Sequence, residues 1–207
     1  MNSKEFKRKY IDHYLLLEND FKKTFDYVSV ERNNYDTYSA MYLKLILSIG
    51  SEIDILKKLI AKMLNPGFDE KKDNPNTIII CCENNFCSLE VKLRREEFVF
   101  KPWDYPQEPD WWTVYNEIKH NRLEKAEKFD KTKQYYQYAN LQNTLLSLGA
   151  LFSLEMYAYR LITINNGEKQ WIPVVKTLFS MNNLYWENKA NGNGTVFIDG
   201  TLYLSDD

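Results

Sequence analysis

The segment from Asn140 to Ile164 constrains the fold of this chain more than any other stretch. Its apolar residues fall on almost every side of a helical wheel, interrupted by Gly149, Glu155 and Arg160. A helix that is apolar all round must be covered by other elements, and this one is too polar to span a bilayer. We therefore expect it to be the central and most buried element of a helical bundle.

Two further segments show helical periodicity on one face only. Apolar side chains recur every three or four residues over residues 3–29 and again over residues 38–64. The turn-forming residues Asn65-Pro66-Gly67 end the second pattern. The sequence thus predicts three long helices that can pack their apolar faces against one another.

Strand-forming residues gather between the second long helix and residue 109. The runs over residues 77–82, 86–93 and 98–100 contain β-branched or aromatic residues, which are typical of strands. We expect a small β insertion at about residues 77–100, within an inserted segment that spans residues 70–108.

The C-terminal segment, residues 195–204, is typical of a hairpin that turns at Asp199-Gly200, a dipeptide suited to a type I′ turn. Together these patterns predict a mainly α fold: an antiparallel helical bundle with a small β insertion and a C-terminal β-hairpin. A chain of 207 residues can bury one sizeable core without disulfides or metals. We therefore expect a single domain over residues 1–207.

Charge and cysteine usage limit the classes of function. The net charge is −2, so no global positive field attracts nucleic acid or an anionic membrane, and any nucleic-acid contact must come from a local patch. Cys81, Cys82 and Cys87 are clustered without a nearby histidine, which argues against a disulfide framework and a zinc site. We expect free thiols, no cofactor or metal, no membrane contact and a cytoplasmic location.

Residues 110 to 122, Asp-Trp-Trp-Thr-Val-Tyr-Asn-Glu-Ile-Lys-His-Asn-Arg, carry polar groups where a helix of the bundle should be apolar. On a helical wheel Arg122 projects from the middle of the apolar arc and Lys119 from near its centre, while Asn116 and His120 share one flank. A cation on a buried helix face requires a carboxylate or a ligand. The segment therefore predicts an anionic partner, either a protein carboxylate or a phosphate.

Two acidic residues on other predicted helices are equally misplaced. Glu52 falls near the centre of the apolar face of the second helix, whereas its neighbour Asp54 points away, and Glu155 lies in the apolar arc of the last helix. Buried carboxylates need partners. We therefore expect Glu52 and Glu155 to meet Lys119 and Arg122 inside the bundle, as a buried ion-pair network.

The long helices, the central insertion and the Asn116-x-x-x-His120 step resemble the HEPN superfamily of helical bundles. Many of its members are metal-independent ribonucleases of toxin–antitoxin and phage-defence systems. Their motif is an Arg, four to six residues of which the first is often Asn, and then His; a subset adds a Tyr two places later. In this chain Asn116 and His120 match, whereas Tyr115 and Arg122 occupy each other's positions.

The resemblance implies a site on the 110–125 helix. His120 would act as acid or base, a cation would hold the phosphate, and Asn116 would orient the imidazole or the phosphate. One histidine does not easily serve as both acid and base, so the implied active form is a homodimer through this helix. The residues assigned to the site are His120, Asn116, Arg122 and Lys119, with Glu52, Glu155 and Tyr115 in support.

Three hypotheses remain open, and the exposure of His120 distinguishes them. The first is a HEPN-type endoribonuclease, or a degenerate relative, that acts on RNA or a nucleotide; a cleft or dimer seam containing His120 and Asn116 favours it. The second is a non-catalytic module that binds a nucleotide or a partner protein in an open pocket near Lys119. The third is a structural protein in which a fully satisfied Arg122 network only sets the helix packing.

Overall fold

The computed structural model describes residues 1–82, 89–94, 98–103, 108–168, 177–182, 196–198 and 201–203. At residues 80–82, 182, 196–198 and 201–203 it describes the backbone alone. Within this part helices predominate and the strands are few and short. The predicted mainly α fold with a minor β component is confirmed.

The N-terminal helical segment runs without a break from Ser3 to Asp26. It consists of α1 (Ser3–Phe6), a π-helical stretch η1 (Lys7–Ile11), α2 (Asp12–Lys23) and a 3₁₀ turn η2 (Thr24–Asp26). Its inward face carries Phe6, Tyr14 and Phe21, all fully buried. The apolar periodicity predicted this face, because residues three and four apart lie on one side of a helix.

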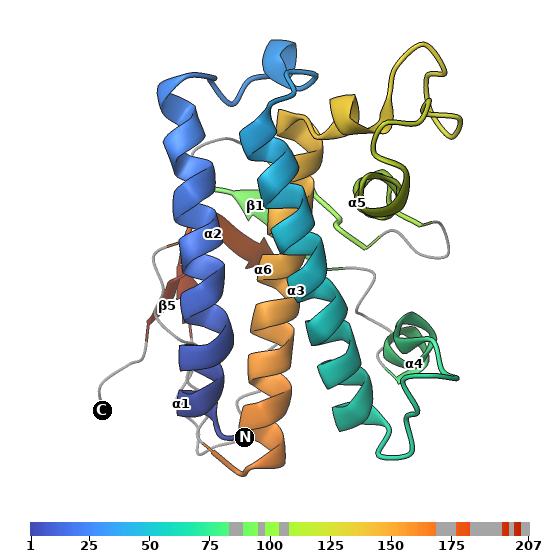
Figure 1. The fold of residues 1–207 in the computed structure, drawn as a ribbon. Coiled ribbons are helices and arrows are strands. Elements are labelled where there is room, and N and C mark those ends of the chain that lie inside the picture. Colours follow the sequence, from blue (N-terminus) through green and yellow to red (C-terminus); the bar gives the residue numbers. More distant parts are fainter. Residues whose placement is uncertain are drawn as a thin grey trace.

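Two helices of equal length form the centre of the molecule. After the 3₁₀ turn η3 (Arg32–Asn34), Ser39 caps α3 (Ala40–Leu64), and Asn140 caps α6 (Leu141–Asn165); each side-chain oxygen accepts an N–H from the first helical turn. α3 and α6 lie side by side, and α2 runs antiparallel to both (Figure 1). By length and composition α6 could cross a membrane, contrary to the sequence expectation that it is too polar, but 89% of its most apolar window is buried inside the protein. It is the central element that its composition predicts.

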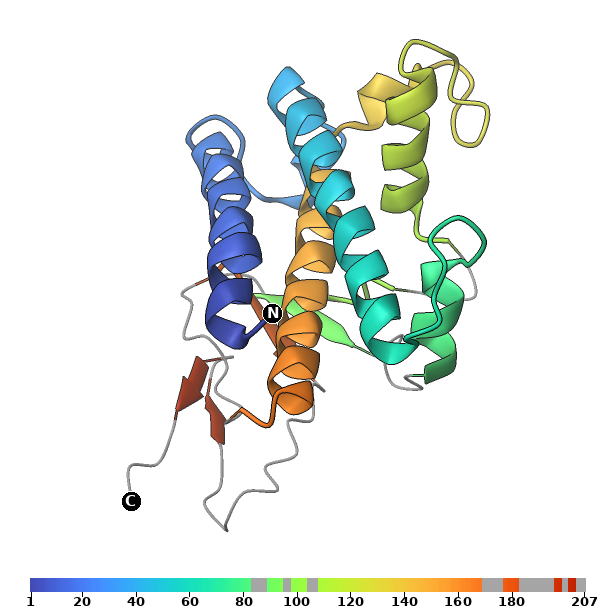
Figure 2. The same ribbon diagram turned by 60° about the horizontal axis from the view of Figure 1, so that its bottom comes forward.

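A small antiparallel sheet packs on the bundle beside α6. Its strand order is β2 (Phe98–Phe100), β1 (Glu90–Leu93) and β3 (Phe179–Asn182). Figure 2 shows the sheet behind α6. Val91, Leu93 and Phe179 are buried against the helices, as one face of an antiparallel sheet usually is. The sequence pattern predicted β1 and β2, but not β3.

The predicted strand over residues 77–82 is wrong, because this segment is the helix α4 (Pro75–Cys82). Proline is favoured at the first helical position, and the Asn74 side chain accepts the N–H of Asn76 at 2.9 Å, as an N-cap does. α4 packs on α3 with Ile79 buried. This tertiary contact and the start signal outweigh the β propensity of the isoleucines.

At the C-terminus, β4 (Val196–Ile198) pairs antiparallel with β5 (Thr201–Tyr203), in agreement with the predicted hairpin. The proposed turn at Asp199-Gly200 lies outside the described residues. So do Cys87 and the side chains of Cys81 and Cys82, whose expected state as free thiols stays a prediction.

The motif helix α5 (Asp110–Asn121) lies on the side of α3 away from α2 (Figures 1 and 2). Gly50 permits its close approach to α3, because a Cβ there would overlap the Tyr115 ring. The chain then continues through a compact connection to the 3₁₀ turn η5 (Tyr135–Tyr138) and α6. α5 therefore has one face against the bundle and one face toward solvent.

Candidate functional site

The inner face of α5 consists of the predicted apolar residues. Its five side chains are buried with exposed fractions of 7% or less; they are Trp111, Trp112, Val114, Tyr115 and Ile118. The two tryptophans therefore serve core packing and cannot stack on bases in this arrangement. On the outer face Asn116 is half-buried and His120, one turn further on, is exposed.

Arg122 is exposed and not buried, contrary to the sequence prediction. It is the C-cap residue of α5, one position after the last helical residue. A helical wheel fixes the direction of a side chain around the axis, but not whether a neighbouring element extends that far along the axis. Arg122 follows the last helical residue of α5, and its side chain is exposed to solvent.

Lys119 is also exposed, and its acidic neighbour is Asp54. The helical wheel places Asp54 on the side of its helix that faces away from the core. The Lys119 Nζ lies 3.9 Å from Asp54 Oδ2, and the Tyr115 hydroxyl donates to the same oxygen at 3.3 Å. Burial, followed by the charge of Asp54, raises the pKa of Tyr115 to about 12. Tyr115 thus holds the seam between α3 and α5 and stays protonated near neutral pH.

Glu52 and Glu155 do not contact the cations of α5. Glu52 lies 3.5 Å from His13 on the other side of α3. Glu155 is buried, and its Oε2 has no hydrogen-bond partner within the described residues. Burial, and then the nearby charge of Glu52, raises the pKa of Glu155 well above its usual value. The predicted Lys119/Arg122–Glu52/Glu155 network is therefore wrong: the acids gather on the α2 side of α3 and the cations on the α5 side.

Among the described residues the buried cation is Lys57, which the sequence patterns did not predict. Lys57 belongs to α3 and is 2% exposed; its Nζ lies 3.6 Å from the Trp112 ring centre and 4.8 Å from that of Trp103. No hydrogen-bond acceptor reaches this Nζ from the part of the chain that the structure describes. Burial lowers its pKa to about 7, against the opposing charges of Asp54 and Glu108.

A sequence signal for Lys57 does exist. It follows Ile53 by four residues and precedes Ile60 by three, so it lies on the same helix face as these two fully buried residues. The Trp103 and Trp112 rings stabilise the Lys57 ammonium at this position, because a cation over an aromatic face is attracted by the ring quadrupole. The packed rings of Trp103 and Trp112 make this a closed packing site rather than an open one.

The connection after α5 presents most of the local positive charge. An isolated bridge between Lys125 and Gln134 and the stacked rings of Phe129 and Tyr138 hold it in one conformation. Lys128 pairs with Glu117 at 2.5 Å. By contrast Arg122 and Lys125 have no ion-pair partner among the described residues. This end of the molecule therefore offers cations to an external anion.

The four residues assigned to the site are only partly brought together. Asn116 and His120 lie one turn apart and share the outer face, as predicted. His120 and Arg122 are two residues apart, a spacing at which side chains do not face each other, and Lys119 leans toward Asp54. Within a single chain the His120 imidazole and the Arg122 guanidinium therefore do not point at the same place.

Elsewhere in the described part, no group of three or more His, Cys, Asp or Glu side chains is arranged to hold a metal ion. No protein-family model matches this chain, and no curated protein or solved structure matches it closely enough to indicate kinship.

Proposed function

We propose that this chain is a HEPN-like domain of the toxin or phage-defence type that interacts with RNA or a nucleotide through the outer face of α5, with a degenerate metal-independent ribonuclease site. One observation carries the proposal: His120 is exposed directly above Asn116, on a helix whose other long face is fully packed. Arg122 and Lys125, which have no ion-pair partner among the described residues, are exposed and follow α5 in the chain. Their exposure leaves His120 and these cations accessible to an anionic ligand.

The chemistry needs a proton acceptor for the 2′-hydroxyl and a proton donor for the leaving 5′-oxygen. The 2′-oxygen attacks phosphorus, the bond to the 5′-oxygen breaks, and a 2′,3′-cyclic phosphate and a 5′-hydroxyl result. The imidazole of His120 can serve one of these steps, because histidine is the most frequent general acid or base in enzymes. Arg122 can bind the phosphate bidentately, and Asn116 can orient the imidazole or the phosphate.

Two copies of α5 would complete such a site. In a two-fold dimer the His120 of one protomer can face the Arg122 of its partner, which one chain alone does not achieve. Leu123, 65% exposed at the same end of α5, is an apolar residue available for this contact. The proposed assembly is therefore a homodimer through the 110–125 segment.

The test is cleavage of a labelled RNA of mixed sequence by the purified chain in EDTA. Wild-type protein should cleave it, with a rate per chain that rises with protein concentration. His120→Ala should abolish cleavage, because a general acid or base contributes about 10²–10⁴-fold. Asn116→Ala should reduce it less. His13→Ala is the matched control and should leave cleavage unchanged, since His13 pairs with Glu52 on α3, away from α5.

A wild-type chain that dimerises but leaves RNA intact would refute the ribonuclease and leave a binding module. Binding is then measured by fluorescence anisotropy with the same RNA. Arg122→Gln should weaken it and flatten its salt dependence, because each released counterion contributes to that slope. Arg8→Gln, which removes an exposed arginine from η1, is the control. Absence of binding at low salt, both to this RNA and to a labelled nucleotide, would overturn the proposed function altogether.

A further inference from the structure

An aromatic pair lies beside the end of α5, outside the four residues assigned to the site. The ring of Tyr136, in η5, meets the ring of Tyr38, which precedes α3, edge to face with the ring centres 5.8 Å apart. Tyr38 is 47% exposed and Tyr136 is half-buried. Because aromatic rings prefer edge-to-face and offset-stacked contacts, an accessible pair of this kind can take up a further flat ring.

The three tyrosines of η5 differ in their roles. The hydroxyls of Tyr135 and Tyr138 both accept backbone N–H groups of the connection after α5, and Tyr138 also stacks on Phe129. These two side chains therefore hold the connection together. Tyr136 instead turns to Tyr38, and neither hydroxyl of this pair has a hydrogen-bond partner among the described residues. The pair is thus the part of η5 that is available to a ligand.

The backbone beneath the pair is fixed. Tyr38 forms an isolated antiparallel bridge with Asn140, the residue that caps α6. The N–H of Leu141 donates to the carbonyl of Thr37 at 2.9 Å. The segment that carries Tyr38 is therefore attached to the start of α6. A ligand that contacts the pair does not have to order this backbone first, which lowers the entropic cost of binding.

The pair adjoins the end of α5. The N–H of Tyr136 donates to the carbonyl of Arg122 at 3.1 Å, and the Gln134 side chain donates to the carbonyl of Leu123 at 2.7 Å. These two bonds bring η5 against the residues that follow α5. Figure 2 shows that α3 begins at the same end of the bundle at which α5 ends. The exposed rings and the residues proposed to bind phosphate therefore lie close together.

The connection over residues 122–134 holds five cations and three acids. Lys131 pairs with Glu127, and Lys128 pairs with Glu117 of α5. The cations without an ion-pair partner among the described residues are Arg122, Lys125 and Lys133. The connection therefore presents a net positive charge beside the aromatic pair. Cations that meet the backbone, next to rings on which bases stack, are the combination that binds single-stranded nucleic acids.

From the exposed rings, their fixed backbone and the adjacent cations, we infer that the ligand of this face is single-stranded RNA, with a base stacked on the Tyr38–Tyr136 pair. The inference rests on the proposed function and extends its site from α5 to the segment before α3. The phosphates meet Arg122 and Lys125, and an unstacked base contacts the rings. Every base has a π face, so the rings add affinity for unpaired RNA of any sequence.

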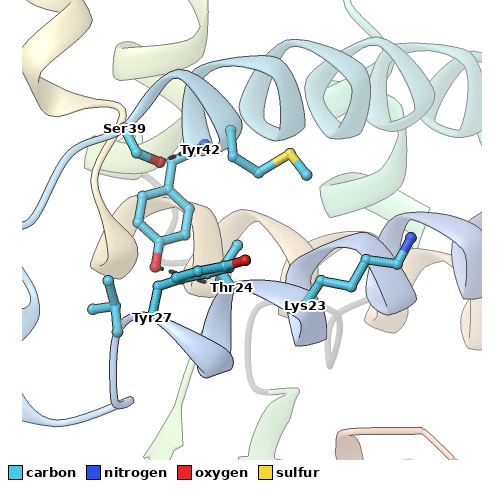
Figure 3. Close-up of a pocket in the computed structure, with 7 residues that line it drawn as sticks. Lys23, Thr24, Tyr27, Ser39 and Tyr42 are labelled. Carbon is cyan, nitrogen blue, oxygen red and sulfur yellow. Dashed lines mark hydrogen bonds between the residues drawn. The ribbon is translucent and has the colours of Figure 1, made fainter.

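The pocket in Figure 3 supplies a matched control residue. Tyr27, which is 87% exposed, lines this pocket together with Ser39. The backbone at Ser39 is extended, and successive side chains of an extended chain point to opposite sides. Tyr38 therefore points away from the pocket that Tyr27 lines. Tyr27 is an exposed tyrosine at the same end of the bundle but outside the inferred contact.

The test measures fluorescence anisotropy at low salt with three labelled RNAs of equal length. They are a single strand of mixed sequence, the same strand paired with its complement, and a single strand of abasic ribose phosphates. The abasic strand keeps every phosphate and has no base to stack. Wild-type protein should bind the single strand about tenfold more tightly than the abasic strand, as expected from one stacked base.

Substitutions then locate the contact. Tyr38→Leu should weaken binding of the single strand about tenfold and leave the abasic strand and the duplex unchanged, whereas Tyr38→Phe, which keeps the ring, should bind as wild type does. Tyr27→Leu should change nothing. Arg122→Gln should weaken all three RNAs, because it removes a contact to phosphate. Thermal unfolding of each variant verifies that the fold is kept.

The outcomes separate this inference from the proposed function. Equal binding of the single strand and the abasic strand would overturn the stacked base and leave the proposed function in place. So would a loss of binding in Arg122→Gln without one in Tyr38→Leu, or binding of a labelled nucleotide but of no RNA. A wild-type chain that binds neither RNA nor nucleotide would overturn both.

Discussion

The two faces of α5 differ in what surrounds their polar groups. On the inner face, Lys57 of α3 is enclosed by Trp103 and Trp112, and Tyr115 and Lys119 converge on Asp54 at the edge of the seam. On the outer face, His120 and Arg122 meet solvent. The inner groups are fixed by packing and set the position of the helix. The outer groups are free to meet a partner, and they carry the proposed function.

This difference separates polar groups that serve packing, such as the buried Lys57, from those that are accessible to a ligand, such as the exposed His120. A buried cation such as Lys57 is stabilised by the side chains that enclose it, here Trp103 and Trp112. Its unusual position therefore reflects how α3 and α5 pack together. An exposed histidine on a well-packed helix has no packing role to explain it. The proposed function therefore rests on the flank of α5 that carries Asn116 and His120, and not on the apolar arc from which Arg122 and Lys119 were predicted to project.

The largest loss of stability should follow from removing a buried ring from the inner face of α5. Trp112→Ala removes a 7% exposed ring that covers the Lys57 ammonium at 3.6 Å. The cost to the free energy of unfolding should be about 3–5 kcal/mol, as for large aromatic deletions in cores. Denaturant unfolding measures it, with Leu123→Ala on the exposed side as a control expected within about 0.5 kcal/mol. Equal effects of the two substitutions would remove the distinction between the faces.

The pH dependence of stability tests whether Lys57 is truly enclosed. Its pKa is about 7 in the folded chain and about 10.4 when unfolded. Between these values the unfolded state binds more protons, so stability should rise with pH. From pH 7 to pH 9 the gain should be about 2 kcal/mol larger in wild type than in Lys57→Met. Parallel pH profiles of the two proteins would show that Lys57 is solvated.

Glu155 offers a smaller test on the far side of α3. Its raised pKa means that the folded chain loses stability as pH rises above the unfolded value, because the buried carboxyl resists ionisation. Glu155→Gln should therefore stabilise the protein by about 1 kcal/mol at pH 8. At pH 4, where the carboxyl is protonated in the folded chain, that gain should vanish. A destabilised variant at pH 8 would indicate that the carboxylate has a cationic partner.

The smallest effect should come from Arg122. Arg122→Ala should change the free energy of unfolding by less than about 0.5 kcal/mol, because the side chain is exposed and forms no ion pair with described residues. Thermal unfolding at neutral pH measures it. A loss of several kcal/mol would restore the buried ion-pair network that the sequence had predicted.

Much of the fold follows from local patterns. The long helices, the buried α6 and the strands at Glu90–Leu93 and Phe98–Phe100 agree with hydrophobic periodicity, since each pattern fixes which side of an element faces the core. The helix at Pro75–Cys82 was missed, although Asn74 and Pro75 supplied its start signal. β3 could not be foreseen, because its pairing with β1 joins segments far apart in the sequence.

The candidate site was predicted less well. The pairing of Asn116 with His120 on one flank of α5 needs only helical geometry, and it agrees with the structure. The partners of Lys119 and Arg122 depend on how far α3 and α6 extend beside α5. A helical wheel does not give this information, because it shows only the direction of each side chain around one helix axis. For the same reason Asp54 was not predicted as the neighbour of Lys119. Lys57 was not predicted either, although its place on the helix face of Ile53 and Ile60 is visible in the sequence.

We propose that the outer face of α5 and the connection after it contact RNA, while the inner face is structural. Hydrogen–deuterium exchange of the full chain, with and without a saturating single-stranded RNA at low salt, tests this directly. We expect slower exchange on RNA addition over residues 116–134 and unchanged exchange over the Lys57 region of α3. Protection that is absent from residues 116–134, or that appears elsewhere in their place, would contradict it.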